Sequence, residues 1–225
     1  ITLSVTASGT DNNYQWYKDG SILPTETNST ITVSGSAPGS YYVIISNSCG
    51  NVTSNAVDVI TRPAPTVTDP TDVTACVNGN VTMSVEATGT GLSYQWFKGG
   101  VAMTNGVSVS GVSSSSLTIN NVTLVDAGSY YVVVTNSCGT ATSLSATLTV
   151  NSPILITSQP VGGTICSSDN ITLSVTASGT DNNYQWYKNG SILPTETNST
   201  ITVSGSAPGS YYVIISNSCG NVTSN

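Results

Sequence analysis

Short runs of alternating apolar and polar residues follow one another along the chain, and turn-forming residues separate them. In one such run, Val81, Met83, Val85 and Ala87 alternate with polar side chains. Alternation with a period of two is typical of a β-strand that buries one face. Gly, Asn, Asp and Pro lie between the runs, and no segment shows a helical period. The pattern therefore predicts an all-β protein.

The same pattern predicts the remaining strands around the centre of the chain. A strand at 94–98 follows the first one, and later strands alternate in the same way up to residue 150. Two sheets that face each other would bury all of these apolar positions. The positions predicted to point inward are Tyr94, Trp96, Leu117, Ile119, Leu144, Ala146, Leu148 and Val150.

A long internal repeat organises the chain. Residues 1–55 recur as residues 171–225 with one change, from Asp19 to Asn189. A diverged version lies between these copies, with YQWFK at 94–98 in place of YQWYK. A fixed motif that returns in each copy indicates repeated domains of one architecture.

The three tryptophans set the size of the repeating unit. Trp16, Trp96 and Trp186 lie 80 and 90 residues apart, which suits one small domain each. The middle copy is longer between its Trp and its Tyr pair, so it has room for an extra edge strand. The sequence predicts a first domain at 1–62 that lacks its first strand, a complete domain at 63–150, and a domain at 151–225 that lacks its end.

Two motifs resemble the I-set immunoglobulin pattern. They are the Trp of YQWFK at 94–98 and the run DAGSY at 126–130, whose tyrosine forms the tyrosine corner in that family. The resemblance covers the whole chain and implies tandem immunoglobulin-like β-sandwich domains in a head-to-tail array. The outer copies depart from it, since Ala37 and Ala207 replace the Asp. Valines also stand where the family places its intersheet disulfide, in the pairs Val5 and Val43, Val85 and Val132, and Val175 and Val213.

A cysteine just before the second strand and a Cys-Gly in the F–G turn accompany these departures. This combination is similar to Ig-like repeats of very large bacterial surface adhesins, above all those of Bacteroidota that the type IX system exports. The resemblance implies secretion, a cell-surface location, and a role in adhesion or gliding of a filament or stalk.

The five cysteines fall into two periodic classes. Cys76 and Cys166 each lie five residues before the first apolar residue of a strand, and Cys49, Cys138 and Cys219 each precede a Gly in an F–G turn. Periodic placement indicates a structural role. No His and no C-x-x-C pair are present, so disulfides formed in an oxidising compartment are the natural expectation.

Two disulfide pairings are compatible with these positions. Pairing within domains would join Cys76 to Cys138 and Cys166 to Cys219, but the two turns lie at opposite ends of a sandwich, roughly 26 Å apart at ~3.3 Å per residue. A disulfide needs Cα atoms within ~7 Å of each other. A head-to-tail array would instead bring Cys76 to Cys219, and we favour this interdomain pairing. Cys49, Cys138 and Cys166 would then pair with domains outside this segment, while pairing within domains stays open.

Strand alternation places one aromatic pair on the outer face of each domain. The pairs are Tyr17 with Tyr42, Phe97 with Tyr131, and Tyr187 with Tyr212. Such a face is a possible contact surface for a glycan or a protein. A cross-strand pair that stabilises the sheet by ~0.2–1 kcal/mol is the interpretation we favour.

Composition excludes several function classes. Lys and Arg number 4 against 11 Asp and Glu, for a net charge of −7, so no nucleic-acid partner is expected. No apolar run approaches the ~20 residues of a membrane-spanning helix. Scattered carboxylates such as Asp11, Asp69, Asp72 and Asp181 do not form a dense calcium loop. We find no catalytic constellation, and we expect no enzyme, no cofactor and no metal site.

Two functions remain. The first is a structural and adhesive stalk at the cell surface, whose partners are the neighbouring Ig-like repeats of the same polypeptide. The second is a binding module that recognises a glycan or a protein, and an array that serves only as a spacer for an enzyme elsewhere stays open. A binding module should vary its loops, whereas the two long copies keep every loop except for position 19, which favours the stalk.

Overall fold

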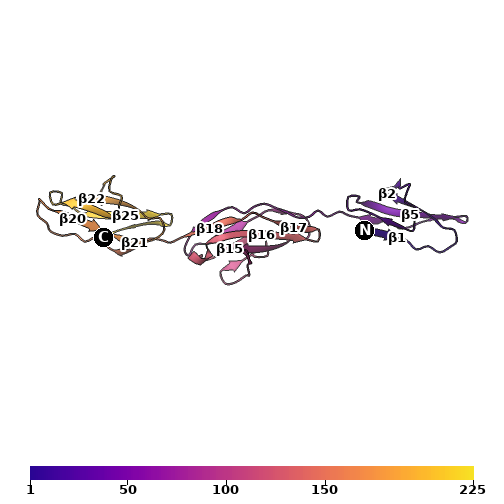
Figure 1. Cartoon of the computed structure of the whole chain (residues 1–225), viewed down its shortest axis with the longest axis horizontal. Coiled ribbons are helices and arrows are strands. Elements are labelled where there is room, and N and C mark those ends of the chain that lie inside the picture. The colour runs from indigo at the N-terminus through magenta and orange to yellow at the C-terminus, as the bar shows by residue number, and fades with distance from the viewer. The chain divides into compact units, whose positions relative to one another are not determined.

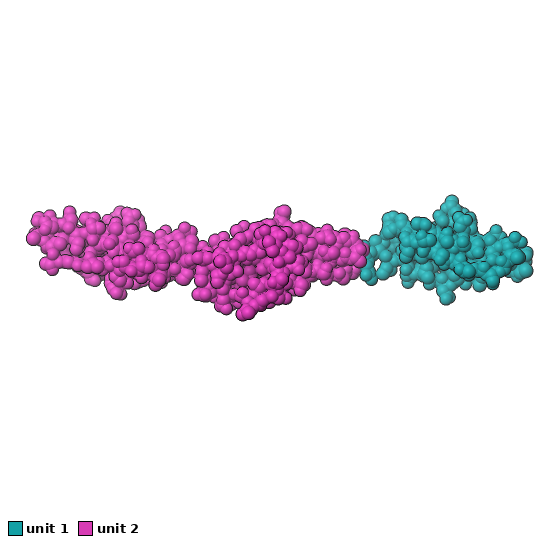
Figure 2. Space-filling model, turned by 60° about the horizontal axis from the view of Figure 1, so that its bottom comes forward, with its two compact units in different colours: residues 1–63 teal, residues 64–225 magenta.

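The computed structural model describes all residues, 1–225, and it consists of strands joined by turns (Figure 1). Its helical part is one 3-10 turn, Leu124–Asp126, so no helix is long enough to cross a membrane. The chain forms two compact units, Ile1–Pro63 and Ala64–Asn225, which Figure 2 colours separately. The prediction of an all-β fold is confirmed.

The middle domain is a sandwich of two sheets. One sheet has the order β10 (Val81–Ser84), β15 (Ser116–Ile119) and β14 (Val109–Ser110). The other has the order β13 (Val101–Ala102), β12 (Ser93–Lys98), β16 (Gly128–Asn136), β18 (Ala146–Asn151) and β9 (Val73–Cys76), and β17 (Gly139–Thr142) also pairs with β16. A short pair, β8 (Thr66–Val67) with β11 (Ala87–Thr88), flanks them. Strand β14 is the extra edge strand for which the longer sequence leaves room.

The predicted inward positions form the core of the middle domain around Trp96, with one exception. Leu144 was predicted to face inward and is 72% exposed. Its neighbour Ser143 takes the inward place, because its hydroxyl accepts a hydrogen bond from the Val132 N–H at 3.1 Å and its own N–H donates to the Val132 carbonyl. These two bonds change the phase of the strand, and β18 begins only at Ala146.

The third domain repeats this architecture within the same unit. Its two paired sheets are β20 (Asn170–Ser174) with β24 (Thr200–Ser204), and β23 (Ser191–Ile192), β22 (Asn183–Lys188), β25 (Tyr211–Asn217) and β26 (Gly220–Thr223). Strand β19 (Leu155–Ser158) pairs with β21 (Thr176–Ser178). Its core around Trp186 is separate from the core around Trp96, so the predicted domains 63–150 and 151–225 have separate cores inside one compact unit.

The first unit has equivalents of the β20–β24 pair and of the sheet around β22, but none of the β19–β21 pair. Strand β1 (Thr2–Ser4) pairs with β4 (Thr30–Thr32), and a second sheet contains β3 (Ser21–Ile22), β2 (Asn13–Lys18), β5 (Gly39–Asn47) and β6 (Gly50–Thr53). Strand β7 (Val57–Val59) pairs with the beginning of β5. The unit ends at Pro63, one residue beyond the predicted boundary.

All three domains contain a tyrosine corner, even where the Asp is missing. The acceptor is a backbone carbonyl, which alanine supplies as well as aspartate does. The tyrosine hydroxyls donate from Tyr41 to Ala37 at 2.7 Å, from Tyr130 to Asp126 at 2.5 Å and from Tyr211 to Ala207 at 2.8 Å. Burial raises the pKa of Tyr130 to about 12, and the negative charge of Asp126 adds to this shift.

Candidate functional site

Each domain closes its core without an intersheet disulfide. Three valines at equivalent positions are fully buried, namely Val43 in β5, Val132 in β16 and Val213 in β25. Each makes two hydrogen bonds with a serine that follows the F–G turn: the valine N–H donates to the serine Oγ, and the serine N–H donates to the valine carbonyl. The serines are Ser54, Ser143 and Ser224. The sequence analysis missed these serines, although a Thr-Ser pair occurs at the same place in every copy. They link the last strand to strand F where the usual cystine is absent.

The F–G turn joins β5 to β6, β16 to β17 and β25 to β26, and it holds its cysteine in the same way in all three domains. An Asn two residues earlier accepts a hydrogen bond from the cysteine N–H, a side-chain turn that Asn often makes. The pairs are Asn47 with Cys49 at 2.9 Å, and Asn136 with Cys138 and Asn217 with Cys219, both at 2.8 Å. Local sequence alone therefore positions this sulfur, whether or not it has a partner.

A disulfide joins the middle domain to the third domain. Cys76 and Cys219 are bonded, and their Cα atoms lie 5.7 Å apart. Cys76 ends β9, which runs parallel to β18 and places Cys76 opposite Asn151. Cys219 lies in the turn between β25 and β26. This is the interdomain pair that the sequence analysis favoured.

The remaining cysteines, Cys49, Cys138 and Cys166, are free and exposed in the structure. The alternative bonds within domains are thus not formed, because both Cys76 and Cys219 are used by the interdomain disulfide. That the three free cysteines pair with other domains stays a prediction.

Hydrogen bonds surround the disulfide and fasten the linker between the two domains. Asn217 Nδ2 donates to the carbonyls of Ser152 and Thr180, both at 3.0 Å. Asn151 Nδ2 donates to Ser218 Oγ at 2.7 Å, and the Ser152 N–H donates to Thr180 Oγ1 at 2.9 Å. Residues 151–152 are therefore held against two turns of the third domain, the one that contains Asn217 and Ser218 and the one that contains Thr180. We call this disulfide and its hydrogen bonds the junction.

The same turn in the first unit makes the equivalent contacts within its own domain but none to a linker. Asn47 Nδ2 donates to Asn12 Oδ1 at 3.2 Å and to the Thr10 carbonyl at 3.4 Å. A cavity of about 220 Å³ lies here, and Asn12, Asn47 and Cys49 are among the residues that line it. The equivalent place in the third domain contacts the linker residues Asn151 and Ser152.

The structure brings the predicted aromatic pairs together on neighbouring strands. The rings of Tyr17 and Tyr42, Phe97 and Tyr131, and Tyr187 and Tyr212 stack in parallel, with centroids 5.0 Å apart in every pair. The rings are half-buried, since each covers a face of its partner. Stacking of this kind supports the sheet-stabilising interpretation. A role as a contact face stays a prediction.

The sequence analysis missed an isoleucine beside two of these pairs. Ile22 lies opposite Tyr17 in the sheet register and Ile192 lies opposite Tyr187, and both isoleucines are about half exposed, at 51% and 52%. The middle domain has Ala102 at this position. The side chain beside the stacked pair is therefore larger in the outer copies than in the middle one.

Two of the carboxylates considered as calcium ligands have structural partners instead. Asp69 Oδ1 accepts a hydrogen bond from the Leu144 N–H and Asp72 Oδ1 accepts one from the Thr147 N–H, both at 2.7 Å. Each fastens the segment before the second strand to the last strand of the middle domain. No group of three or more His, Cys, Asp or Glu side chains that could hold a metal ion is present in the structure.

Comparison with protein families assigns both domains of the second unit. Residues 65–150 match the Immunoglobulin I-set domain, and residues 153–225 match the Ig-like domain CHU_C associated. The second domain type is found in Bacteroidota proteins. The chain therefore contains tandem immunoglobulin-like domains, one similar to the I-set type and one similar to the CHU_C-associated type.

Two curated relatives match most of this chain. Muscle M-line assembly protein unc-89 of Caenorhabditis elegans is 29% identical over 216 residues, which are 87% of this chain and 3% of that protein. Protein sidekick-2 of Gallus gallus is 27% identical over 201 residues, 80% of this chain and 9% of that protein. The chain thus spans a small part of the length of either relative.

Solved structures confirm the fold. The I-band fragment I67-I69 from titin superimposes with a TM-score of 0.74 at 18% identity, covering 99% of this chain and 89% of the fragment. Extracellular domains 3-5 of Drosophila OTK give a TM-score of 0.56 at 20% identity, covering 99% of this chain and 88% of theirs. Both are runs of consecutive domains, in agreement with the predicted tandem Ig-like architecture.

Proposed function

We propose that this chain is a segment of a structural and adhesive stalk, an extracellular cell-surface protein whose Ig-like repeats are stapled to one another by disulfides. The bond between Cys76 and Cys219 carries the proposal. It lies between domains, where it adds nothing to the closure of a single sandwich core. A covalent bond at that place instead links consecutive domains of the array to each other.

The periodic cysteines extend this arrangement along the polypeptide. Cys138 lies in the same turn geometry as Cys219, and Cys166 occupies the position of Cys76 in the next repeat. We infer that each of the free cysteines pairs with a neighbouring Ig-like repeat through the same kind of junction. Disulfides form and persist in oxidising compartments, so a series of them along one polypeptide supports a location outside the cell.

A bacterial source and a route of export belong to the same proposal. The similarity of residues 153–225 to a domain type of Bacteroidota proteins supports a bacterial surface adhesin or filament. Export by the type IX system, with a role in adhesion or gliding, fits that assignment. The role is structural and not catalytic, in keeping with a chain that contains no histidine.

The junction has a mechanical consequence. The bonded cysteines are 143 residues apart in the sequence, so tension applied to the chain on either side passes through the disulfide. Most of the middle domain and nearly all of the third domain lie inside this loop and carry no tension. At ~3.4 Å per extended residue the loop withholds roughly 490 Å of chain from stretching. The stalk would resist extension even where a domain unfolds.

Single-molecule force spectroscopy on the full chain tests the proposal directly. The chain is pulled from its ends, oxidised and then in the presence of a reductant, and the total contour length is measured. We expect reduction to release roughly 490 Å of additional chain, because the loop of 143 residues is then free to extend. The double variant Cys76→Ser with Cys219→Ser should show the longer contour without reductant, and Cys138→Ser is the matched control that should not. An oxidised chain that already extends to its full length would contradict the proposal.

A binding module remains a second candidate because of one observation. Ile22 and Ile192 expose half of their surface beside a stacked tyrosine pair, and exposed apolar groups together with aromatic rings are typical of contact surfaces. Replacing both isoleucines by Asp should then abolish retention of the chain on immobilised glycans or on partner cells. Unchanged retention, with unchanged stability, would rule out this binding surface and leave the structural stalk as the proposed function.

A further inference from the structure

One sheet of the outer copies lacks a strand that the middle domain has. In the middle domain β14 pairs with β15, and Ser110 lies opposite Thr118. The equivalent sheets consist of β1 with β4 in the first unit and of β20 with β24 in the third domain. The missing strand would belong to the connections 23–29 and 193–199, which lie inside their domains and form no strand. One side of β4 and of β24 is therefore without a neighbour, and we call this side the open edge.

Backbone groups of two threonines point to the open edge of the third domain. The Val175 N–H donates to the Ser199 carbonyl at 2.9 Å, which fixes the side of this strand that bonds toward β20. In an antiparallel ladder the N–H and C=O groups point to one side at one residue and to the other side at the next. Thr200 and Thr202 therefore direct their backbone N–H and C=O groups away from β20.

The first unit presents the same groups at β4. The Val5 N–H donates to the Ser29 carbonyl at 3.0 Å, so the backbone groups of Thr30 and Thr32 face the open edge there. In the middle domain β14 occupies this side of the strand, which shows that an antiparallel neighbour fits there. The chain thus carries the open edge twice, once in each outer copy.

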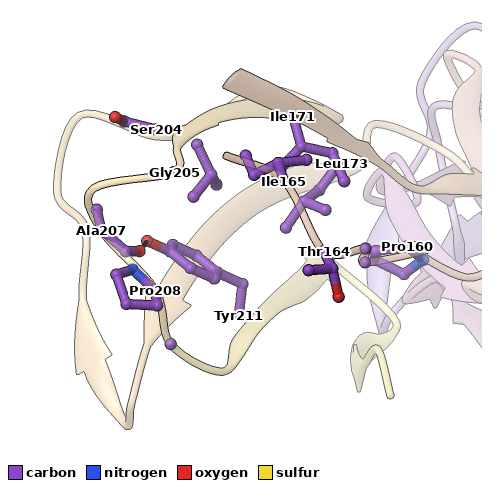
Figure 3. A pocket seen from close by; sticks show the side chains of 14 residues that line it. Pro160, Thr164, Ile165, Ile171, Leu173, Ser204, Gly205, Ala207, Pro208 and Tyr211 are labelled. Carbon is purple, nitrogen blue, oxygen red and sulfur yellow. Dashed lines mark hydrogen bonds between the residues drawn. The ribbon is translucent and has the colours of Figure 1, made fainter. Parts of the chain in front are cut away.

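The side chains along the open edge do not protect it. Strand β24 has the sequence TITVS at 200–204, with exposed threonines and with neither a charge nor a proline. Figure 3 shows a cavity lined by β20 and β24, where Ser204 points away from Ile171 and Leu173. Proteins commonly protect an open edge with Lys, Pro or a bulge. A strand of β-branched residues without these devices is suited to pairing with another strand.

We propose that β24 and β4 pair edge to edge with these strands of a second copy of the chain, so that two arrays associate side by side. The strand is complementary to itself in an antiparallel pair centred on Thr202, where Thr200 lies opposite Ser204. Each Thr202 N–H then donates to the Thr202 carbonyl of the other copy, and each Ser204 N–H donates to the Thr200 carbonyl of the other copy. Opposing threonine side chains also stabilise such a pair.

A second copy suits the open edge because of charge and of repetition. The chain has a net charge of −7, so two copies repel each other, but the five residues of β24 carry no charge. Approach along this strand therefore brings no like charges of the strand together. Because the edge occurs twice in each chain, two weak contacts between the same copies act together.

Sedimentation of the full oxidised chain tests the pairing. The free thiols of Cys49, Cys138 and Cys166 are first alkylated, so that no disulfide can link two copies. We expect the mean mass to rise with concentration above the mass of one chain. The variant Thr32→Lys with Thr202→Lys should weaken this association at least about tenfold, because like charges would meet at the centre of each pair.

The matched control is Thr2→Lys with Thr172→Lys. These residues lie opposite Thr32 and Thr202 in the sheet register, so the control adds the same charges to the same face, one strand away from the open edge. The control chain should associate as the parent chain does. A further variant, Thr32→Pro with Thr202→Pro, removes the edge N–H groups without adding charge and should stay monomeric, since proline is accepted at an edge whose N–H faces solvent.

Amide hydrogen exchange at single residues locates the contact. The amides of Thr200 and Thr202 should exchange more slowly as the concentration rises, whereas those of Ile201 and Val203 already face β20 and should not change. One mass at every concentration would overturn the proposal, as would equal association of the two Lys variants. Protection at the stacked rings instead of at the threonines would also overturn it. None of these outcomes depends on the disulfide or on the stalk.

Discussion

The two long copies, 1–55 and 171–225, have nearly one sequence and different surroundings. Strand β2 pairs with β5 in the same register as β22 with β25, and the tyrosine corners and stacked rings are the same. Their contacts differ at the F–G turn, where Cys219 is bonded while Cys49 is free. The comparison separates the structural features that a repeat forms by itself from the contacts that depend on neighbouring segments.

The largest effect should come from the core tryptophan, and it should be equal in both copies. Trp16→Ala and Trp186→Ala each empty a buried site and remove an indole N–H bond, to Asn28 or to Asn198, both at 2.9 Å. We expect each to lower the free energy of unfolding of its own domain by about 3–5 kcal/mol. Denaturant titration followed by hydrogen exchange resolves the domains.

Unequal losses would show that the junction changes the packing of the third domain as well as its edge contacts. The matched comparison is internal, since the same substitution is made in nearly the same sequence. Reduction of the disulfide in the Trp186→Ala chain provides the control for the staple.

A smaller effect should distinguish the two asparagines of the F–G turn. Asn217→Ala removes bonds to the linker at Ser152 and to Thr180, whereas Asn47→Ala removes bonds only within its own domain. At about 0.5–1.5 kcal/mol per hydrogen bond, we expect Asn217→Ala to cost about 1 kcal/mol more than Asn47→Ala. Amide exchange of Asn151 and Ser152 should accelerate only in the Asn217 variant. Equal acceleration in both variants would contradict the contacts described for the junction.

The smallest effect should come from the position at which the copies differ. Asp19 Oδ1 accepts a hydrogen bond from the Ser40 N–H, and Asn189 Oδ1 accepts one from the Ser210 N–H, both at 2.8 Å. Because both side chains supply the same acceptor, Asp19→Asn should change the free energy of unfolding by less than about 0.5 kcal/mol. A larger change in the free energy of unfolding would mean that the charge of Asp19 affects the stability of this turn. The comparison of the two copies would then have to allow for this difference in charge.

Much of the fold follows from short-range patterns in the sequence. The alternation at 81–87 and the repeated Trp and Tyr motifs predicted the strands, the inward residues and the tandem Ig-like class. The tyrosine corner persisted without its Asp because its acceptor is backbone. Leu144 was misplaced because the bonds between Ser143 and Val132 shift the strand by one residue, and periodicity cannot represent such a shift.

The junction was only partly predictable. Opposite ends of a sandwich are too far apart for one disulfide, so geometry favoured Cys76 with Cys219. The hydrogen bonds around the disulfide were not foreseen, because Asn47 and Asn217 lie in identical sequences and only Asn217 also donates to the linker, at Ser152.

By itself, then, the sequence determined the alternating strands, the repeat and the local turns that present each cysteine. These depend on neighbours in the chain, through pleating, backbone geometry and side-chain hydrogen bonds to nearby amides. Only the tertiary structure decided which cysteine is bonded and which asparagine holds a linker. These depend on segments distant in the sequence, and two copies of one sequence cannot encode different neighbours within themselves.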